Sequence, residues 1–118
     1  MAWEIRIKDE AKKEFSEFHN DIKPQILAGI RKVSQAPLPR PEGYGHPLGN
    51  KNGNNLTGFF KIKYKKIGIR VVYTLVLEQR VMNIVVISRR SDDFCYELAG
   101  KLYKKYGEKL FSDIFSDL

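Results

Sequence analysis

The stretch that decides the fold runs from residue 59 to residue 90 and reads FFKIKYKKIGIRVVYTLVLEQRVMNIVVISRR. It holds three apolar runs separated by two short polar segments. In the first run, Phe60, Ile62 and Tyr64 alternate with lysines, the period-two pattern of a half-buried strand. The other two runs, residues 69–77 and 81–88, are apolar on both faces, which is typical of central strands covered on each side. The stretch therefore predicts an antiparallel meander of three strands.

One more strand and a helix are predicted before the meander. Residues 3–8 alternate between apolar and charged side chains, which indicates a strand. From Asp9 the period changes, because Ala11, Phe15 and Phe18 recur at the spacing of an amphipathic helix. Asp9 is a suitable N-cap for this helix.

A second helix should begin near Pro24, since proline is tolerated only in the first turn of a helix. Ile26, Ile30 and Val33 mark its buried face. The two helices are expected to form a short hairpin laid over the sheet. Residues 36–57 follow, with four prolines and four glycines, and they predict a long loop. A loop of this length is either functional or a tolerated surface excursion.

After the meander, Ser91 supplies a helix cap, followed by acidic residues in the first turn. Phe94, Leu98 and Leu102 share one face of this helix, which Gly107 should end. The C-terminal extension, residues 108–118, has apolar residues at helical spacing and predicts one more short helix that docks on the domain.

Together these elements predict an α+β fold. The order is β-α-α-β-β-β-α with a mainly antiparallel sheet and an extra short C-terminal helix. With 118 residues, the chain is expected to form one domain, residues 1–118, around a single hydrophobic core. Hydrophobic residues make up 42% and charged residues 30%, a balance typical of globular proteins and not of disordered chains.

Composition also narrows the function. No apolar run approaches the roughly 20 residues that span a bilayer, and the N-terminus lacks the pattern of a signal peptide, so we expect a cytoplasmic protein without a membrane partner. Cys95 is the only cysteine, which excludes an intrachain disulfide and disfavours a metal site. No cofactor is expected. The net charge of +7 favours a polyanionic partner such as nucleic acid, although charge of this size also serves solubility alone.

The cations of the meander form the candidate site. Strand alternation puts Lys61, Lys63 and Lys65 on one face, and a hairpin register can bring Arg70 onto the same face. An arginine in so apolar a strand needs an anion. Arg89 and Arg90 close the last strand, so four or five cations are predicted to converge. The alternative is that the lysines only solvate an edge strand and discourage aggregation.

Clustered cations suit phosphodiester cleavage by a 2′-hydroxyl. That reaction needs a base for the hydroxyl, stabilisation of the charged phosphorane and a proton for the leaving 5′-oxygen. Cations supply the second directly, and neighbouring positive charge helps a lysine to act as the base. No metal is required.

Three further residues are weaker candidates. A mechanism with paired histidines is not evident: His19 ends a predicted helix and reads as a surface residue, and His46 lies in the predicted loop, which could still carry it to the site. Tyr96 could stack on a base or hydrogen-bond a phosphate, or simply pack its ring on the sheet.

The element order resembles the RelE/ParE superfamily of toxins. Residues 60–64 (FKIKY) and 68–73 (GIRVVY) are similar to its RelE-like branch, and the resemblance extends roughly from residue 3 to residue 103. It implies a toxin of a type II toxin–antitoxin pair, an endoribonuclease that cuts mRNA in the ribosomal A site without a metal. Its expected partners are a cognate antitoxin, mRNA and the ribosome.

The resemblance also implies residue roles. Lys61 and Lys63 match the two lysines of the catalytic strand, Arg70 the arginine that stabilises the phosphate, Arg90 the second arginine and Tyr96 the late tyrosine that engages the substrate. Lys65 and Arg89 are expected to bind substrate. The five residues that match catalytic positions, from Lys61 to Tyr96, distinguish the chain from the gyrase-directed ParE branch, which generally lacks them.

The chain departs from the family pattern in three places. Asp92 and Asp93 stand where some relatives have basic residues, the loop before the meander is long, and the C-terminal extension is additional. The alternative function is a basic binding module without catalysis, either a ParE-like toxin directed at gyrase or a degenerate toxin that binds RNA or the ribosome.

Overall fold

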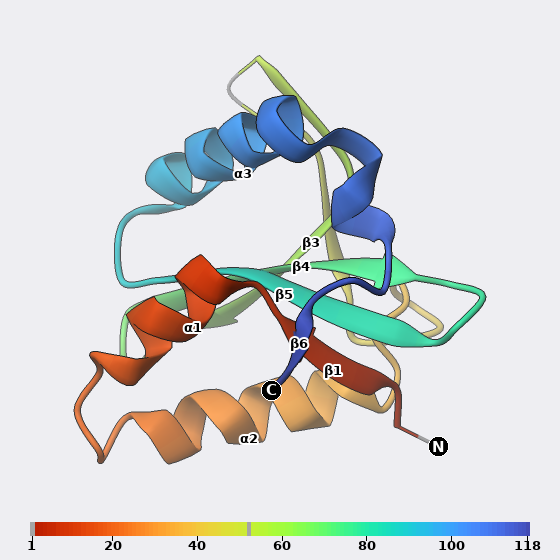
Figure 1. Ribbon diagram of the computed structural model, residues 1–118. Helices are drawn as coiled ribbons and strands as arrows, with labels where there is room; N and C mark the ends of the chain where they lie inside the picture. Colours follow the sequence, from red (N-terminus) through yellow and green to blue (C-terminus); the bar gives the residue numbers. More distant parts are fainter. Residues whose placement is uncertain (1, 52) are drawn as a thin grey trace.

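A computed structural model describes residues 2–51 and 53–118. One six-stranded sheet, in the order β2-β3-β4-β5-β1-β6, separates α1 and α2 on one side from α3 on the other (Figure 1). In chain order the elements are β1 (Glu4–Ile7), α1 (Asp9–Ser16), α2 (Lys23–Ser34), β2 (His46–Lys51), β3 (Asn54–Tyr64), β4 (Ile69–Val76), β5 (Val81–Ser88), α3 (Asp92–Tyr106), a 3₁₀ helix η1 (Gly107–Phe111) and β6 (Ser116–Asp117).

The predicted α+β class and mainly antiparallel sheet are confirmed. β3, β4 and β5 form the antiparallel meander, and only the β1–β5 pair among the described strands runs parallel. β4 and β5 are the central strands, and every residue of β5 is buried. Their apolar character on both faces follows from the helices on each side of the sheet.

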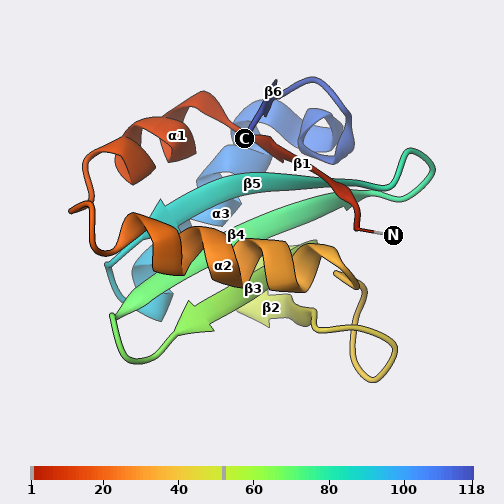
Figure 2. The ribbon, with the colours of Figure 1, turned by 90° about the horizontal axis from the view of Figure 1, so that it is seen from below.

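The sheet divides the core into two layers. The layer beneath α1 and α2 takes alternate residues of β4, including Ile69, Val71 and Tyr73 (Figure 2). The layer beneath α3 and η1 takes Val72 from β4 and Phe59 from β3. Because a strand presents alternate residues to opposite faces, Arg70 lies on the α3 face.

Helix boundaries follow the predicted signals with one exception. Pro24 lies in the first turn of α2, the Ser91 hydroxyl caps α3 by accepting from the Phe94 N–H at 3.2 Å, and Gly107 ends α3 with φ of 58°. The prediction that Asp9 caps the first helix is wrong. Lys8 holds that position with extended backbone angles, and Asp9 is the first helical residue.

The loop predicted over residues 36–57 is wrong in its second half. Residues 46–51 form β2, and β3 begins already at Asn54, so the two strands make an antiparallel hairpin. β2 lies at the edge of the sheet, where a proline is tolerated, and its register shifts between Pro47 and Gly49. The proline and glycine content therefore indicated a loop where the structure has an edge strand.

The C-terminal extension docks as predicted, but not as a regular helix. Only the five residues of η1 are helical, and the chain then ends with β6, which pairs with β1. Leu110 is fully buried, whereas Ile114 and Leu118 are exposed. The Leu110 carbonyl accepts hydrogen bonds from the Thr74 hydroxyl and, at 3.1 Å, from the Asn83 amide.

β5 contains one extra residue relative to β4. Val72 pairs with Val86, but Tyr73 pairs with Ile84, so Val85 is a bulge. Val85 and Val86 consequently belong to the same core layer, beneath α3. On either side of the bulge the polar residues Asn83 and Ser88 both lie opposite residues of the α3 face, Thr74 and Arg70 respectively.

Candidate functional site

Three of the predicted cations lie together on the α3 face of the sheet. Lys63 pairs directly with Arg70 across the β3–β4 ladder, and Lys61 lies two residues before Lys63 on the same face of β3. Direct cross-strand neighbours share a face, so the register that sequence alternation could only suggest is the one observed. We call Lys61, Lys63 and Arg70 the cationic cluster.

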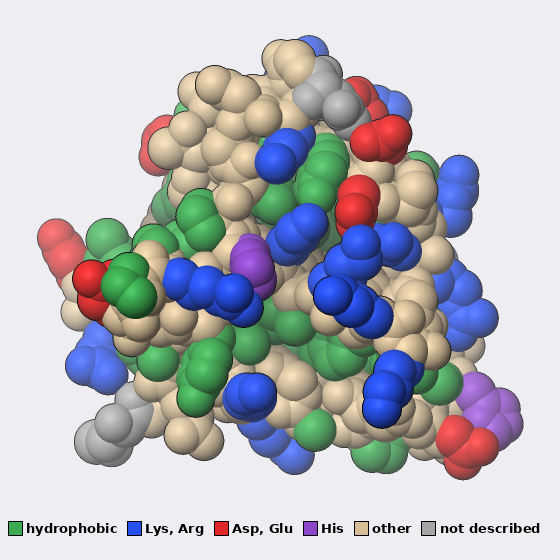
Figure 3. Space-filling model, turned by 180° about the vertical axis from the view of Figure 1, so that it is seen from behind, with side chains coloured by type: hydrophobic (Ala, Val, Ile, Leu, Met, Phe, Trp, Pro, Cys, Tyr) green, Lys and Arg blue, Asp and Glu red, His purple; other side chains and the backbone are tan. Residues whose placement is uncertain are grey.

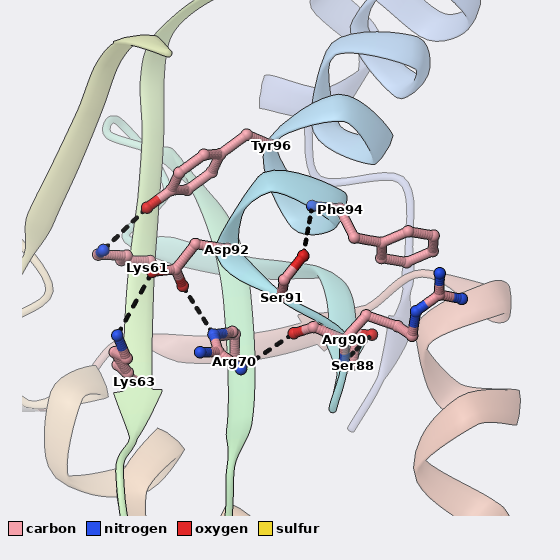
Figure 4. A network of polar contacts seen from close by, with 9 residues as sticks. All are labelled: Lys61, Lys63, Arg70, Ser88, Arg90, Ser91, Asp92, Phe94 and Tyr96. Atoms are coloured by element: carbon pink, nitrogen blue, oxygen red, sulfur yellow. Dashed lines mark hydrogen bonds and ion pairs between the residues drawn. The ribbon is translucent and has the colours of Figure 1, made fainter. Parts of the chain in front are cut away.

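Asp92, the first residue of α3, lies against the cationic cluster. Arg70 Nε donates to Asp92 Oδ1 at 2.7 Å, and Lys63 Nζ donates to Asp92 Oδ2 at 3.3 Å (Figure 4). Arg70 Nη1 also donates to the Arg90 carbonyl at 3.0 Å. An arginine in this apolar strand was expected to need an anion. The Asp92 carboxylate, from the same chain, is that anion.

The electrostatics of Asp92 reflect these contacts. Burial alone would raise the pKa of its carboxyl, but the hydrogen bonds from Arg70 and Lys63, with the charge of Lys61, hold that pKa below its usual value. The side chains of Lys63 and Asp92 remain 37% and 31% exposed. An anionic ligand can therefore reach the network from solvent.

Tyr96 joins the cluster from the second turn of α3. Its ring is buried in the layer beneath α3, and its hydroxyl accepts a hydrogen bond from Lys61 Nζ at 2.9 Å (Figure 4). Packing of the ring in the core, one of the two alternatives for this tyrosine, is therefore confirmed, and contact of Tyr96 with an RNA base or phosphate stays a prediction. The hydroxyl fixes the Lys61 ammonium next to the Lys63–Arg70 pair.

The predicted convergence of four or five cations is wrong for Arg89 and Arg90. The Arg90 guanidinium turns away from Arg70 and lies 4.2 Å from the centre of the Phe94 ring (Figure 4). The Arg89 guanidinium lies 4.9 Å from the Phe18 ring, over the other core layer. Lys65 follows the end of β3, in the turn to β4.

The structure adds His46, which sequence reasoning left in a loop. As the first residue of β2 it pairs with Lys61, so its side chain shares the face of the cationic cluster. Loss of water around the ring, and then the charges of Arg40 and Lys61, lower the pKa of His46 below its usual value. A strand beginning at residue 46 was not visible in so irregular a sequence.

The space-filling view shows the setting. Seen from behind the view of Figure 1, Lys and Arg side chains gather around a histidine across the middle of the molecule, with acidic side chains mostly nearer the rim (Figure 3). Within residues 2–51 and 53–118, no group of three or more His, Cys, Asp and Glu side chains is placed to hold a metal. Over the same residues, no helix has the length and hydrophobicity needed to cross a membrane.

No family model matches the chain. A curated Escherichia coli protein described as a RelE-like toxin is 24% identical over 102 residues, which cover 86% of this chain and 97% of that protein.

Solved structures share the fold. A free-state arginine mutant of the Escherichia coli toxin RelE aligns with a TM-score of 0.66 at 20% identity, covering 86% of this chain and 98% of that one. RelE chains of two toxin–antitoxin complexes align over 76% of this chain: RelBE of Escherichia coli (TM-score 0.60, 19% identity, 99% of that chain) and RelBE2 of Mycobacterium tuberculosis (0.61, 20%, 100%). The fold of this chain is that of RelE, and the resemblance expected from the sequence is confirmed.

Proposed function

We propose that this RelE-like chain is the toxin of a type II toxin–antitoxin system and an endoribonuclease that cleaves mRNA at the ribosomal A site. The observation that carries the proposal is the cationic cluster, with Tyr96 holding Lys61 beside Lys63 and Arg70. The similarity to a RelE-like toxin over most of both chains supports it independently.

The chemistry follows from what the cluster can do. A 2′-hydroxyl attacks the adjacent phosphorus, the P–O5′ bond breaks, and the products are a 2′,3′-cyclic phosphate and a 5′-hydroxyl. Negative charge accumulates on the non-bridging oxygens of the phosphorane. Arg70 offers a planar fork that matches two of these oxygens, and Lys63 adds a point charge beside it.

Arg90 can join the site only after a rotation of its side chain. Its carbonyl already lies 3.0 Å from Arg70 Nη1, so its backbone is adjacent to the cluster although its guanidinium rests on Phe94. We infer that Arg90 engages RNA as a second arginine, with Lys65 and Arg89 binding the substrate backbone further out. The function requires access to ribosomes, and the proposed location is the cytoplasm.

An antitoxin is the proposed protein partner. Several structural relatives are toxins in complex with an antitoxin, and the net charge of +7 gives this chain a surface that an acidic segment would cover. Such a segment would compete with RNA for Lys61, Lys63 and Arg70. Masking of these cations would keep the toxin inactive in the cell.

The non-catalytic alternative has one specific observation in its favour. Asp92 already pairs with both Lys63 and Arg70, as it would in a ParE-like toxin directed at gyrase or in a degenerate toxin that binds RNA or the ribosome. We favour the enzyme because Asp92 neutralises only one of the two charges of Lys63 and Arg70. One positive charge remains to bind a phosphate.

Growth and cleavage together test the proposal. Induction of the chain should arrest growth, co-expression of an adjacent antitoxin gene should restore it, and purified toxin should cut ribosome-bound mRNA in the presence of EDTA. The new ends should be a cyclic phosphate and a 5′-hydroxyl. Normal growth at verified soluble expression, with intact mRNA in vitro, contradicts an active toxin; growth arrest with intact mRNA favours the binding module.

A further inference from the structure

His46 places an imidazole, a side chain that can accept a proton near neutral pH, beside the cationic cluster. It pairs with Lys61 across the β2–β3 ladder, and Lys61 in turn contacts Tyr96. Arg70 cannot accept a proton, because a guanidinium stays protonated in proteins. Lys63 donates to Asp92 and is used as a cation.

The surroundings of His46 favour its neutral form. The charged neighbours that act on the ring are Arg40, from the segment before β2, and Lys61, from β3. α3 contributes Tyr96, whose hydroxyl contacts Lys61, and Asp92, whose carboxylate contacts Arg70 at 2.7 Å and Lys63 at 3.3 Å. With its pKa lowered, the imidazole is unprotonated at pH 7, and the ring is exposed enough to meet a ligand.

We propose that His46 is a further catalytic residue, the general base that removes the proton from the attacking 2′-hydroxyl. The inference rests on the proposed ribonuclease function and assigns the step that this function leaves without a residue. It is carried by the cross-strand position of His46 beside Lys61 and on the face of Arg70.

Protons and bonds balance across the step. The 2′-oxygen forms a bond to phosphorus as its proton passes to an unprotonated ring nitrogen of His46, giving an imidazolium. The P–O5′ bond breaks, and the leaving 5′-oxygen takes a proton from the Lys61 ammonium, which the Tyr96 hydroxyl holds in place. Proton exchange with water returns His46 and Lys61 to their starting forms.

The test is the pH dependence of single-turnover cleavage of ribosome-bound mRNA. For the wild type, the rate should rise with pH as His46 loses its proton and then level off. His46→Gln should lower the rate about a hundredfold near neutral pH and abolish this acid-side limb. His19→Gln is the matched control, because His19 is the only other histidine and its side chain is 74% exposed beside Asp21.

A second measurement uses no cleavage. The imidazole of His46, followed by NMR on the intact protein, should titrate below the ordinary pKa of a histidine. Addition of a 2′-deoxy dinucleotide, which cannot be cut, should perturb the His46 signal and leave the His19 signal unchanged. Melting temperatures of both variants should stay near that of the wild type.

The outcomes separate the inference from the function beneath it. If the wild type cleaves and Arg70→Ala does not, but His46→Gln keeps the wild-type rate and pH profile, only the inference fails. It also fails if His46→Gln is slower with the acid limb intact, since the histidine then only positions other groups. A wild type that cuts no RNA under any condition overturns both.

Discussion

Two ion-pair networks in this molecule have opposite compositions. Where the C-terminal extension packs beside β1, Arg6 contacts three carboxylates. These are Asp117 at 2.9 Å, Asp113 at 3.1 Å and Glu4 at 3.6 Å. At the cationic cluster, one carboxylate, Asp92, is shared by Arg70 and Lys63. The first network has acid in excess, and the second has base in excess.

The difference matches a structural role for the first network and the proposed RNA-binding role for the second. Around Arg6 the charge is more than compensated, and two of the three carboxylates, Asp113 and Asp117, belong to the C-terminal extension, so the network ties the end of the extension to β1. Around Asp92 a positive charge remains, and it faces solvent next to Lys61. A phosphate is attracted to the second network and repelled by the first.

Of the substitutions that test this comparison, Arg70→Ala should have the largest effect, on the rate of RNA cleavage. If Arg70 neutralises charge that develops on the phosphorane, its removal should slow single-turnover cleavage by about a hundredfold or more and weaken RNA binding much less. Lysine should restore only part of the rate, because it lacks the planar fork. A folded Arg70→Ala protein with wild-type cleavage, or one that loses stability but not its rate, would show Arg70 to be structural.

Tyr96→Phe tests how the Lys61 ammonium is positioned. The ring and its contacts beneath α3 stay, but Lys61 Nζ loses its 2.9 Å acceptor. We expect cleavage to slow by about tenfold, as is usual for the loss of one positioning hydrogen bond, with the melting temperature nearly unchanged. Tyr103→Phe, whose hydroxyl contacts Glu108 instead, is the matched control. Equal rates for both variants would remove Tyr96 from the site.

Asp92→Asn should strengthen RNA binding by about threefold at low salt and make binding more salt-dependent, since Lys63 and Arg70 become free to pair with phosphates. The same change of charge in the other network, Asp117→Asn, should have no such effect. Filter binding of a labelled, uncleavable RNA across a salt series gives both quantities. Weaker binding by Asp92→Asn would mean that the carboxylate organises the cations more than it opposes RNA.

The pKa of Asp92 adds a pH dependence to its own variant. Because that pKa is lowered in the folded protein, its ion pairs stabilise the fold above the ordinary carboxyl value of 3.8, and this stabilisation is lost as the pH falls through the folded value. Wild type should therefore melt above Asp92→Asn at neutral pH and converge with it in acid. Parallel melting curves at every pH contradict the assigned contacts.

Arg6→Ala should have the smallest effect. Glu4 and Asp117 are largely exposed, and pairs of this kind contribute only about 0.5 kcal/mol to the free energy of unfolding. We expect faster amide exchange in residues 112–118 and an unchanged rate of RNA cleavage. Slow exchange throughout that segment in the variant would mean that the hydrogen bonds to Leu110 alone retain the extension.

Sequence alone predicted the parts of the fold that depend on periodicity. The meander, both N-terminal helices and the capped α3 follow from alternation, helical spacing and the Ser91 hydroxyl. β2 was not predicted, because proline and glycine usually indicate a loop. Within a sheet, residues such as Pro47 and Gly49 are found mainly in edge strands or at bulges. β6 has only two residues, too few for any pattern.

The site was predicted in its backbone placement and missed in its side-chain directions. Alternation and register put Lys61, Lys63 and Arg70 on one face. The sequence could not predict that the Arg90 guanidinium packs against the Phe94 ring, since the rotamer of a long side chain depends on what it contacts. His46 stayed a weak candidate because its pairing with Lys61 is known only once β2 is known.

The bulge at Val85 sets the parity of β5. Arg70 and Thr74 are an even number of residues apart in β4 and share the α3 face, but their partners Ser88 and Asn83 are an odd number apart. In a regular strand an odd spacing would turn one of those partners to the opposite face. The extra residue corrects the count, so one face serves both the cluster near Ser88 and the anchor of the C-terminal extension at Asn83. Substitutions at position 85 should be far better tolerated than its deletion, which would leave either the end with the cationic cluster or the anchored end facing the wrong helix.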